Sequence, residues 1–188
     1  IFGLLGLWFI LRPVDSRDGS PTREERLAPM CEAAGLTVAG DSLYAVTWYG
    51  LYASRPLVVK LFSSSVVVSA DFALPEACPK HLKFEVVSKG ETGALPWGDP
   101  ILDAVADVKA DHGNAAAVAL LSATVRAFLV SRFREEGGND WRLRVEPGRV
   151  AYTLRSMPSE AALKRCFDQI TDDAAFLDRE AQGFPALL

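Results

Sequence analysis

Apolar and polar residues alternate through the middle of the chain, and no other feature constrains the fold as strongly. In one such stretch Val66, Val68 and Ala70 share a face, while Ser69 and Asp71 share the other. A period of two is typical of half-buried β-strands. Four segments show it in succession: 43–52, 57–62, 65–72 and 82–86. Their connections are too short to cross over a sheet, so the pattern predicts antiparallel pairing.

The second half of the chain adds a hairpin and helices. Apolar residues on either side of Pro147-Gly148 alternate with polar ones, which predicts two strands joined by a tight turn. A final helix is predicted from one apolar seam: Leu163, Phe167, Ile170, Ala174 and Leu177. Asn114 and Ser122 are expected to cap two further helices, and segment 101–109 fits either a helix or a strand. The predicted fold class is α+β, an antiparallel meander sheet with a C-terminal hairpin and helices packed on one face.

A first helix is expected shortly before this sheet. Leu27 and Cys31 recur at helical spacing, and Gly35 is placed to end the helix. Pro29 lacks the backbone N–H that a helix interior needs, so it is expected either in the first turn, with a helix start near Arg26, or at a kink in a longer helix.

The N-terminus predicts a membrane anchor, because residues 1–11 contain no polar side chain and Arg12-Pro13 ends the run. Eleven helical residues cover about half of a bilayer core, which needs roughly 20. We therefore interpret this segment as the C-terminal part of a transmembrane helix that begins upstream. The anchor residues are Ile1, Phe2, Leu4, Leu5, Leu7, Trp8, Phe9, Ile10, Leu11 and Arg12. A core helix or strand of the domain is the alternative, and a cleaved signal peptide is disfavoured because no small-residue cleavage position follows.

The expected organisation is one domain hung from this anchor. The chain has 188 residues, which suits a single core. Its parts are the anchor at 1–12, a polar tether at 13–25, one α+β domain at 26–182 and a tail at 183–188. Four cations follow the apolar run, namely Arg12, Arg17, Arg23 and Arg26. They favour a single-pass protein with a cytoplasmic domain.

Composition excludes some classes of protein. With 49% apolar and 23% charged residues the chain belongs to folded proteins, and a net charge of -4 argues against nucleic acid as a partner. The three cysteines cannot all pair within one chain, so we expect Cys31 and Cys166 to be buried free thiols.

Few residues suggest chemistry. Cys78 and His81 are close in sequence and could share a metal ion or form a catalytic pair, but two ligands do not make a site. His112 is the other histidine. An acidic row at Asp99, Asp103, Asp107 and Asp111 has the wrong spacing for a calcium loop. The motifs of nucleotide-binding loops and common hydrolases do not occur, so we predict no catalytic residue, metal or cofactor.

The remaining clue to function is a set of side chains suited to protein contacts. Aromatic residues and arginine are enriched in interfaces, and the candidates are Trp48, Tyr49, Tyr52, Trp97, Arg142 and Arg144. With the anchor, they favour a non-catalytic accessory or structural subunit that docks on other membrane protein subunits, with the bilayer as a second partner. A membrane-tethered domain that binds a lipid or small molecule is the alternative, and an enzyme using Cys78 and His81 is the third hypothesis.

Overall fold

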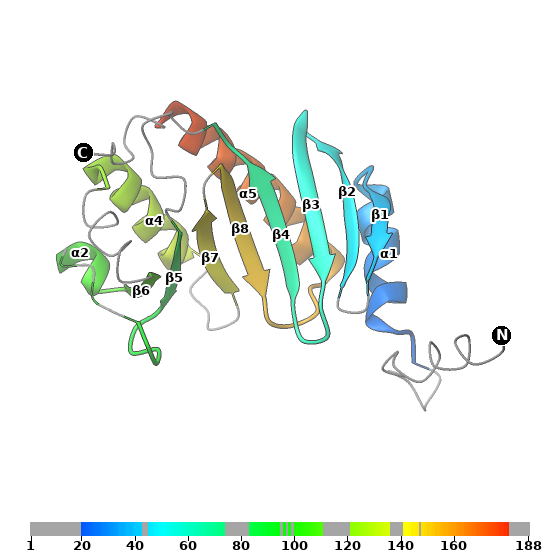
Figure 1. The fold of residues 1–188 in the computed structure, drawn as a ribbon, viewed down its shortest axis with the longest axis horizontal. Helices are drawn as coiled ribbons and strands as arrows, with labels where there is room; N and C mark the ends of the chain where they lie inside the picture. Colours follow the sequence, from blue (N-terminus) through cyan, green and yellow to red (C-terminus); the bar gives the residue numbers. More distant parts are fainter. Residues whose placement is uncertain are drawn as a thin grey trace, which may run out of the picture.

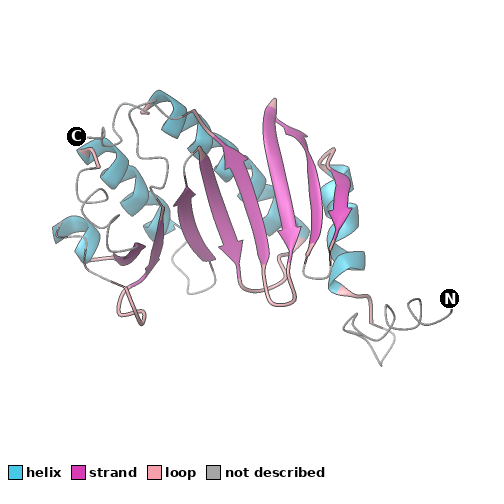
Figure 2. Cartoon of the chain, in the orientation of Figure 1, coloured by secondary structure: helices cyan, strands magenta, loops and turns pink. Residues whose placement is uncertain are grey.

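A computed structural model describes nine parts of the chain: residues 20–42, 45–73, 83–94, 96, 98, 100–110, 121–135, 141–146 and 148–180. These residues form an α+β fold in which one antiparallel sheet of eight strands carries helices on one face (Figures 1 and 2). The predicted fold class is correct at this level. The predicted transmembrane segment, 1–12, lies outside the described residues.

The sheet joins both halves of the chain. Its strand order is β1-β2-β3-β4-β8-β7-β5-β6, and every pairing is antiparallel. The strands are β1 (Thr37–Asp41), β2 (Val46–Tyr52), β3 (Arg55–Leu61), β4 (Val66–Asp71), β5 (Phe84–Ser88), β6 (Ala106–Ala110), β7 (Trp141–Glu146) and β8 (Arg149–Leu154). Strands β1 to β4 form a meander, and the predicted hairpin of β7 and β8 pairs with β4 at the centre.

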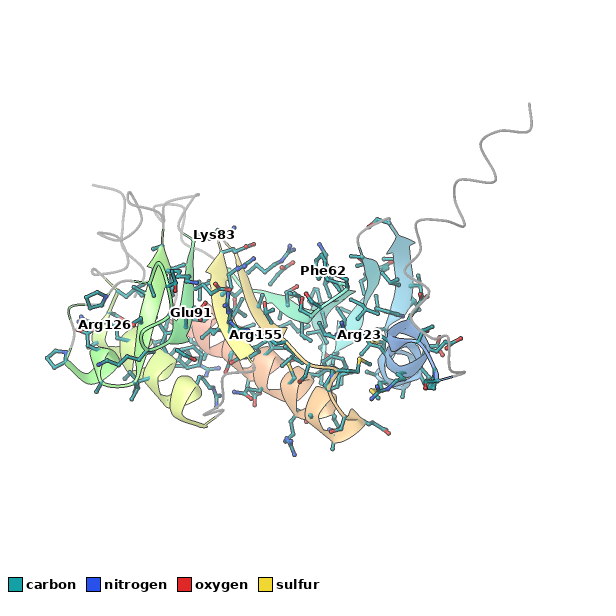
Figure 3. All side chains as sticks on the ribbon, turned by 90° about the horizontal axis from the view of Figure 1, so that it is seen from below. Arg23, Phe62, Lys83, Glu91, Arg126 and Arg155 are labelled. Atoms are coloured by element: carbon teal, nitrogen blue, oxygen red, sulfur yellow. The ribbon has the colours of Figure 1, made fainter. Side chains whose placement is uncertain are left out.

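Helices cover one face of the sheet. They are α1 (Arg23–Ala33), the short α2 (Pro100–Asp103), α4 (Ala123–Glu135) and α5 (Glu160–Arg179). The predicted seam of α5 is buried along its whole length, from Leu163 to Leu177. Figure 3 shows α4 and α5 on the same side of the sheet. The Ser122 cap of α4 is confirmed, since its hydroxyl accepts a hydrogen bond from Val125 N.

Helix α1 begins earlier than its sequence predicted. Thr22 forms a capping box with Glu25, and this pair starts the helix at Arg23 despite Pro29 in its interior. The prediction of a start near Arg26 was wrong: the capping box fixes the start at Arg23, and Pro29 lies inside the longer helix. At the other end the structure confirms the Gly35 stop. Gly35 has a φ of 79°, and Leu36 N donates to Cys31 O across it, as in a Schellman motif.

The sequence pattern did not predict strand β1, and it did not decide between helix and strand for the segment that contains β6. Strand β1 is an edge strand with no clear alternation, and a register shift between Val38 and Gly40 interrupts it. Segment 101–109, which fitted either a helix or a strand, contains one of each. Helix α2 ends at Asp103, and strand β6 begins at Ala106. The structure also begins β2 at Val46, and residues 43 and 44 lie outside the described part.

Candidate functional site

The sheet has one helix-covered face and one open face. Along β2, Trp48 points into the core with no exposed surface, whereas Tyr49 and Leu51 point the other way. Strand β7 repeats the alternation, since buried Leu143 and Val145 separate outward-facing polar residues. In β5, by contrast, the four residues from Phe84 to Val87 are all buried. We take the open face as the candidate contact site, since it presents side chains from strands far apart in the sequence.

One end of the sheet is apolar at its surface. Three large hydrophobic residues are exposed in the described part of the chain. The exposed fraction of the residue surface is 57% for Val38, 55% for Tyr49 and 66% for Leu51. We name these three residues the apolar corner. Val38 pairs with Trp48 across the ladder, so it lies on the helix side of β1, while Tyr49 and Leu51 lie on the open face. The corner therefore surrounds the edge of the sheet.

The opposite half of the open face is charged. Glu91, in the turn after β5, accepts from Lys109 Nζ at 2.6 Å and from Arg142, and Arg155 lies 3.7 Å away. Glu85 of β5 is a second acceptor, with Arg142 at 3.4 Å and Arg144 at 3.3 Å. We name the charged half by its six members: Glu85, Glu91, Lys109, Arg142, Arg144 and Arg155. Four cations surround these two carboxylates, and a third carboxylate, Glu146, lies 3.7 Å from Arg144.

Glu91 stays ionised within this cluster. Burial by itself raises the pKa of a carboxyl, but the hydrogen bond from Lys109 and the charges of Arg142 and Arg155 outweigh burial here. The pKa of Glu91 therefore lies below its ordinary value. A permanent anion at this position fixes the directions of the surrounding cations.

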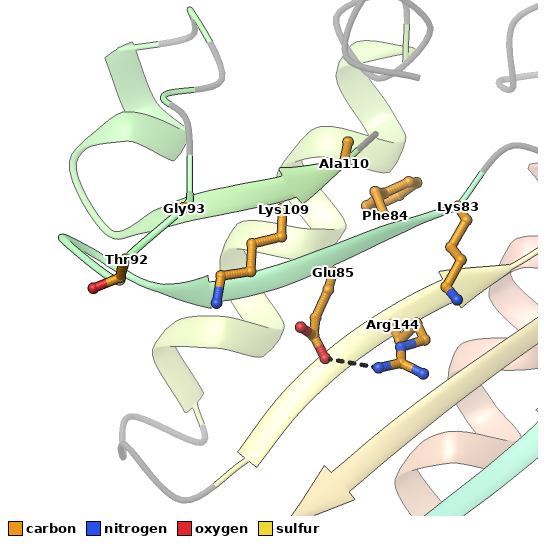
Figure 4. A pocket seen from close by; sticks show the side chains of 8 residues that line it. All are labelled: Lys83, Phe84, Glu85, Thr92, Gly93, Lys109, Ala110 and Arg144. Atoms are coloured by element: carbon orange, nitrogen blue, oxygen red, sulfur yellow. Dashed lines mark hydrogen bonds and ion pairs between the residues drawn. The ribbon is translucent and has the colours of Figure 1, made fainter. Parts of the chain in front are cut away.

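A pocket of about 440 Å³ lies beside this cluster (Figure 4). Its lining comes from β5, β6, β7 and the turn after β5: Lys83, Phe84, Glu85, Thr92, Gly93, Lys109, Ala110 and Arg144. Three of these residues are cations and one is a carboxylate. Figure 4 shows Glu85 and Arg144 facing one another across the dashed ion pair. The lining favours a polar or anionic group over an acyl chain.

A buried polar cluster lies on the other face, between the sheet and the helices. Asp173 of α5 is fully buried and accepts from Tyr152 Oη and from Arg132 Nε, the latter at 2.7 Å. Burial raises the pKa of Asp173 to about 6, although both hydrogen bonds oppose the shift. Because its members come from β8, α4 and α5, the cluster fixes these three elements together.

The structure separates the predicted interface residues into three groups. Trp48 belongs to the core, so its assignment to a partner surface was wrong; its alternation partner Tyr49 occupies that surface instead. Tyr52 stacks edge-on against Phe167 and donates to Asp168 at 2.5 Å on the helix side. Arg142 and Arg144 do lie on the open face, in ion pairs. Trp97 lies outside the described residues.

The structure tests part of the predicted chemistry. Cys31 and Cys166 are buried, as predicted, and neither forms a disulfide; burial raises the pKa of Cys31 to about 12. Cys78, His81 and His112 lie outside the described residues, as do Asp99 and Asp111. The acidic row is divided between α2, which holds Asp103, and β6, which holds Asp107. Within the described part, no three His, Cys, Asp or Glu side chains come together to hold a metal ion.

The structure leaves the predicted anchor untested. The anchor residues, from Ile1 to Arg12, precede the first described residue, Ser20. Among the helices that the structure describes, none is both long and apolar enough to span a membrane.

Sequence reasoning missed half of the charged cluster. The arginines of the hairpin were recognised as candidates for a contact surface, but their partners Glu85, Glu91 and Lys109 were not. Their convergence depends on β5 lying between β6 and β7, an order that the chain does not follow. The available signal was the charged residues at alternate positions of β6 and β7, which mark the outward face of each strand but not which strands are neighbours.

Comparison with known proteins supports the fold alone. No protein-family model matches the sequence, and no curated protein matches it. Among solved structures, the chain is similar to the crystal structure of the mycobacterial trehalose monomycolate transport factor A, TtfA, with a TM-score of 0.51 and 8% identity. The similarity covers 88% of this chain and 98% of that one. The class defined here is thus an α+β fold of the kind seen in TtfA.

Proposed function

We propose that this chain is a membrane-tethered, non-catalytic accessory protein whose domain docks on a larger membrane protein assembly. The observation that carries this proposal is the open face of the sheet, where Tyr49, Leu51 and the charged half lie on the side opposite to the described helices. Exposed aromatic and arginine side chains on one face are characteristic of contact surfaces. The apolar segment 1–11 supplies the tether, and the arginines after it favour a cytoplasmic domain.

The structural neighbour supports the proposal in general terms. TtfA is described as a transport factor for trehalose monomycolate, a lipid. A lipid-related role for a protein of this fold agrees with a membrane-associated accessory protein.

Native sizing tests the proposal directly. The full chain is extracted from its own membranes in mild detergent, and we expect it to migrate well above its monomer mass together with specific membrane proteins. Arg144→Gln, on the open face, should reduce this co-purification. Lys164→Gln, on the exposed side of α5, is the matched control and should leave it unchanged. A strictly monomeric protein without co-purifying partners contradicts the proposal.

The pocket beside the charged half favours a second candidate function, the binding of a lipid headgroup or a small anion. Lys83, Lys109 and Arg144 supply the cations for such a ligand. Mass spectrometry of organic extracts from the purified full chain tests it. An enriched anionic lipid that Lys109→Gln removes supports this function, and an extract that matches the bulk membrane contradicts it.

A further inference from the structure

The apolar corner has a shape that restricts what can cover it. Tyr49 and Leu51 lie on the open face of β2, whereas Val38 lies on the helix side of the edge strand β1. An occupant must therefore surround the edge of the sheet, because a flat partner on either face reaches only part of the corner. A fluid lipid interface adapts to a ridge of this shape.

The residues around the corner fit lipid headgroups. Val58 pairs with Tyr49 across the ladder, and Pro56 pairs with Leu51. Lys60 is exposed and pairs with Thr47 on the same face. Strands β2 and β3 contain no acidic residue. Anionic headgroups repel carboxylates and attract lysine, while tyrosine is enriched at the membrane interface.

The chain length before α1 allows this contact. Residues 13–22 connect the predicted anchor to the start of α1, and ten extended residues reach about 35 Å. Helix α1 has eleven residues and is about 16 Å long, and β1 follows it after a short turn. The corner therefore lies within reach of the bilayer surface at which the anchor ends.

We propose that the apolar corner inserts into the headgroup region of the bilayer that holds the N-terminal anchor, with Tyr49 and Leu51 on one side of the edge strand and Val38 on the other. This inference rests on the proposed function, because it needs the tether. Three side chains are too few to hold a protein on a membrane by themselves, but a tether keeps the domain at high local concentration near the lipid. The contact orients the domain so that the charged half, at the other end of the eight-stranded sheet, is directed away from the bilayer.

The structure also sets the depth of insertion. β1 is an edge strand, so one row of its backbone N–H and C=O groups is not paired within the sheet. Such groups are tolerated among hydrated headgroups and are costly in the hydrocarbon core. The corner therefore stops at the level of the headgroups, where tyrosine is favoured.

Site-specific photocrosslinking tests the inference. The full chain is reconstituted in nanodiscs that contain only this protein and a mixture of phosphatidylcholine and phosphatidylglycerol. Leu51→p-benzoylphenylalanine places the photoreactive group in the corner, and Arg165→p-benzoylphenylalanine places it at an exposed position of α5 as the matched control. After irradiation, we expect severalfold more lipid adducts at position 51 than at position 165.

The outcomes separate this inference from the proposed function. Equal lipid adducts at both positions, or protein dimers in place of lipid adducts at position 51, overturn the inference even when the chain stays anchored. Release of the chain from the bilayer by an alkaline wash contradicts the tether itself. Thermal unfolding followed by circular dichroism confirms that each variant is folded, and Leu51→Ser should retain the melting temperature because its side chain is exposed.

Discussion

Asp173 shows how a single residue links stability to pH. Its carboxyl is fully buried on the face of α5 that packs against the core. It accepts hydrogen bonds from Tyr152 and Arg132. Burial raises its pKa from 3.8 to about 6, so the folded state binds the proton more tightly than the unfolded state. Its contribution to stability is complete below about pH 4 and is lost as the pH rises through 6.

We predict that Asp173→Asn removes this dependence. Asparagine keeps the shape and one acceptor, so the cluster can form without a buried charge. Between pH 4.5 and 7.5 the free energy of unfolding of the wild type should fall relative to the variant by about 2 kcal/mol, since most of the pKa difference lies in this range. Urea unfolding of the wild type and the variant at pH 4.5 and at pH 7.5 measures this difference in the free energy of unfolding.

Asp168→Asn, on the exposed side of the same helix, is the control for this experiment. Its carboxylate accepts from Tyr52 and Lys164, and the hydrogen bond from Tyr52 is the main cause of a lowered pKa. The free energy of unfolding of Asp168→Asn should therefore not increase relative to that of the wild type as the pH rises. If the difference in the free energy of unfolding between the wild type and Asp173→Asn is constant from pH 4.5 to pH 7.5, ionisation of the buried carboxyl does not destabilise the fold.

Gly50 shows how one element fits against another. It lies in β2, directly under the turn that ends α1. A Cβ built on it would lie 2.7 Å from Gly35 O and 3.2 Å from Leu36 Cα, which are backbone atoms that cannot move aside separately. The glycine thus permits the close approach of α1 to the sheet.

We predict that Gly50→Ala lowers the free energy of unfolding by about 1–3 kcal/mol, because the new methyl group overpacks this contact. Gly40→Ala is the matched control, since Gly40 is in the neighbouring strand with open space around its Cβ position. Denaturant unfolding compares the two variants. Equal stabilities would show that α1 shifts away from the sheet without cost.

At the scale of the whole molecule, the sheet makes the strand-rich first half and the helix-rich second half into one core. β4 and β8 pair through Ala70 and Val150 at the centre, and α5 packs on both strands. Cys31 reports on the first half and Cys166 on the second, and both are buried.

We predict that both thiols become reactive at the same denaturant concentration, as expected for one cooperative domain. A Cys78→Ser variant is labelled with a thiol reagent in increasing urea, and mass spectrometry quantifies each peptide. An earlier midpoint for Cys31 than for Cys166 would mean that the two halves unfold as separate units.

The sequence determined by itself the local elements with strong periodicity: the alternation of β4, the hairpin of β7 and β8, and the buried seam of α5. These depend on side-chain patterns within one segment, where burial of one face is sufficient to select the structure. It also determined Gly35 as a helix stop. Pro29, by contrast, misplaced the start of α1, because capping energy and one lost hydrogen bond have similar magnitudes.

Only the tertiary structure decided the strand order, the position of Trp48 and the composition of the open face. Glu91, Lys109 and Arg142 are separated by many residues, and they meet because β5 lies between β6 and β7. The alternation of β2 divides its residues between two faces, but only packing against α1 and α5 decides that Trp48 is buried and Tyr49 is exposed. Long-range pairing depends on the fit of all faces at once, and no local pattern in the sequence encodes it.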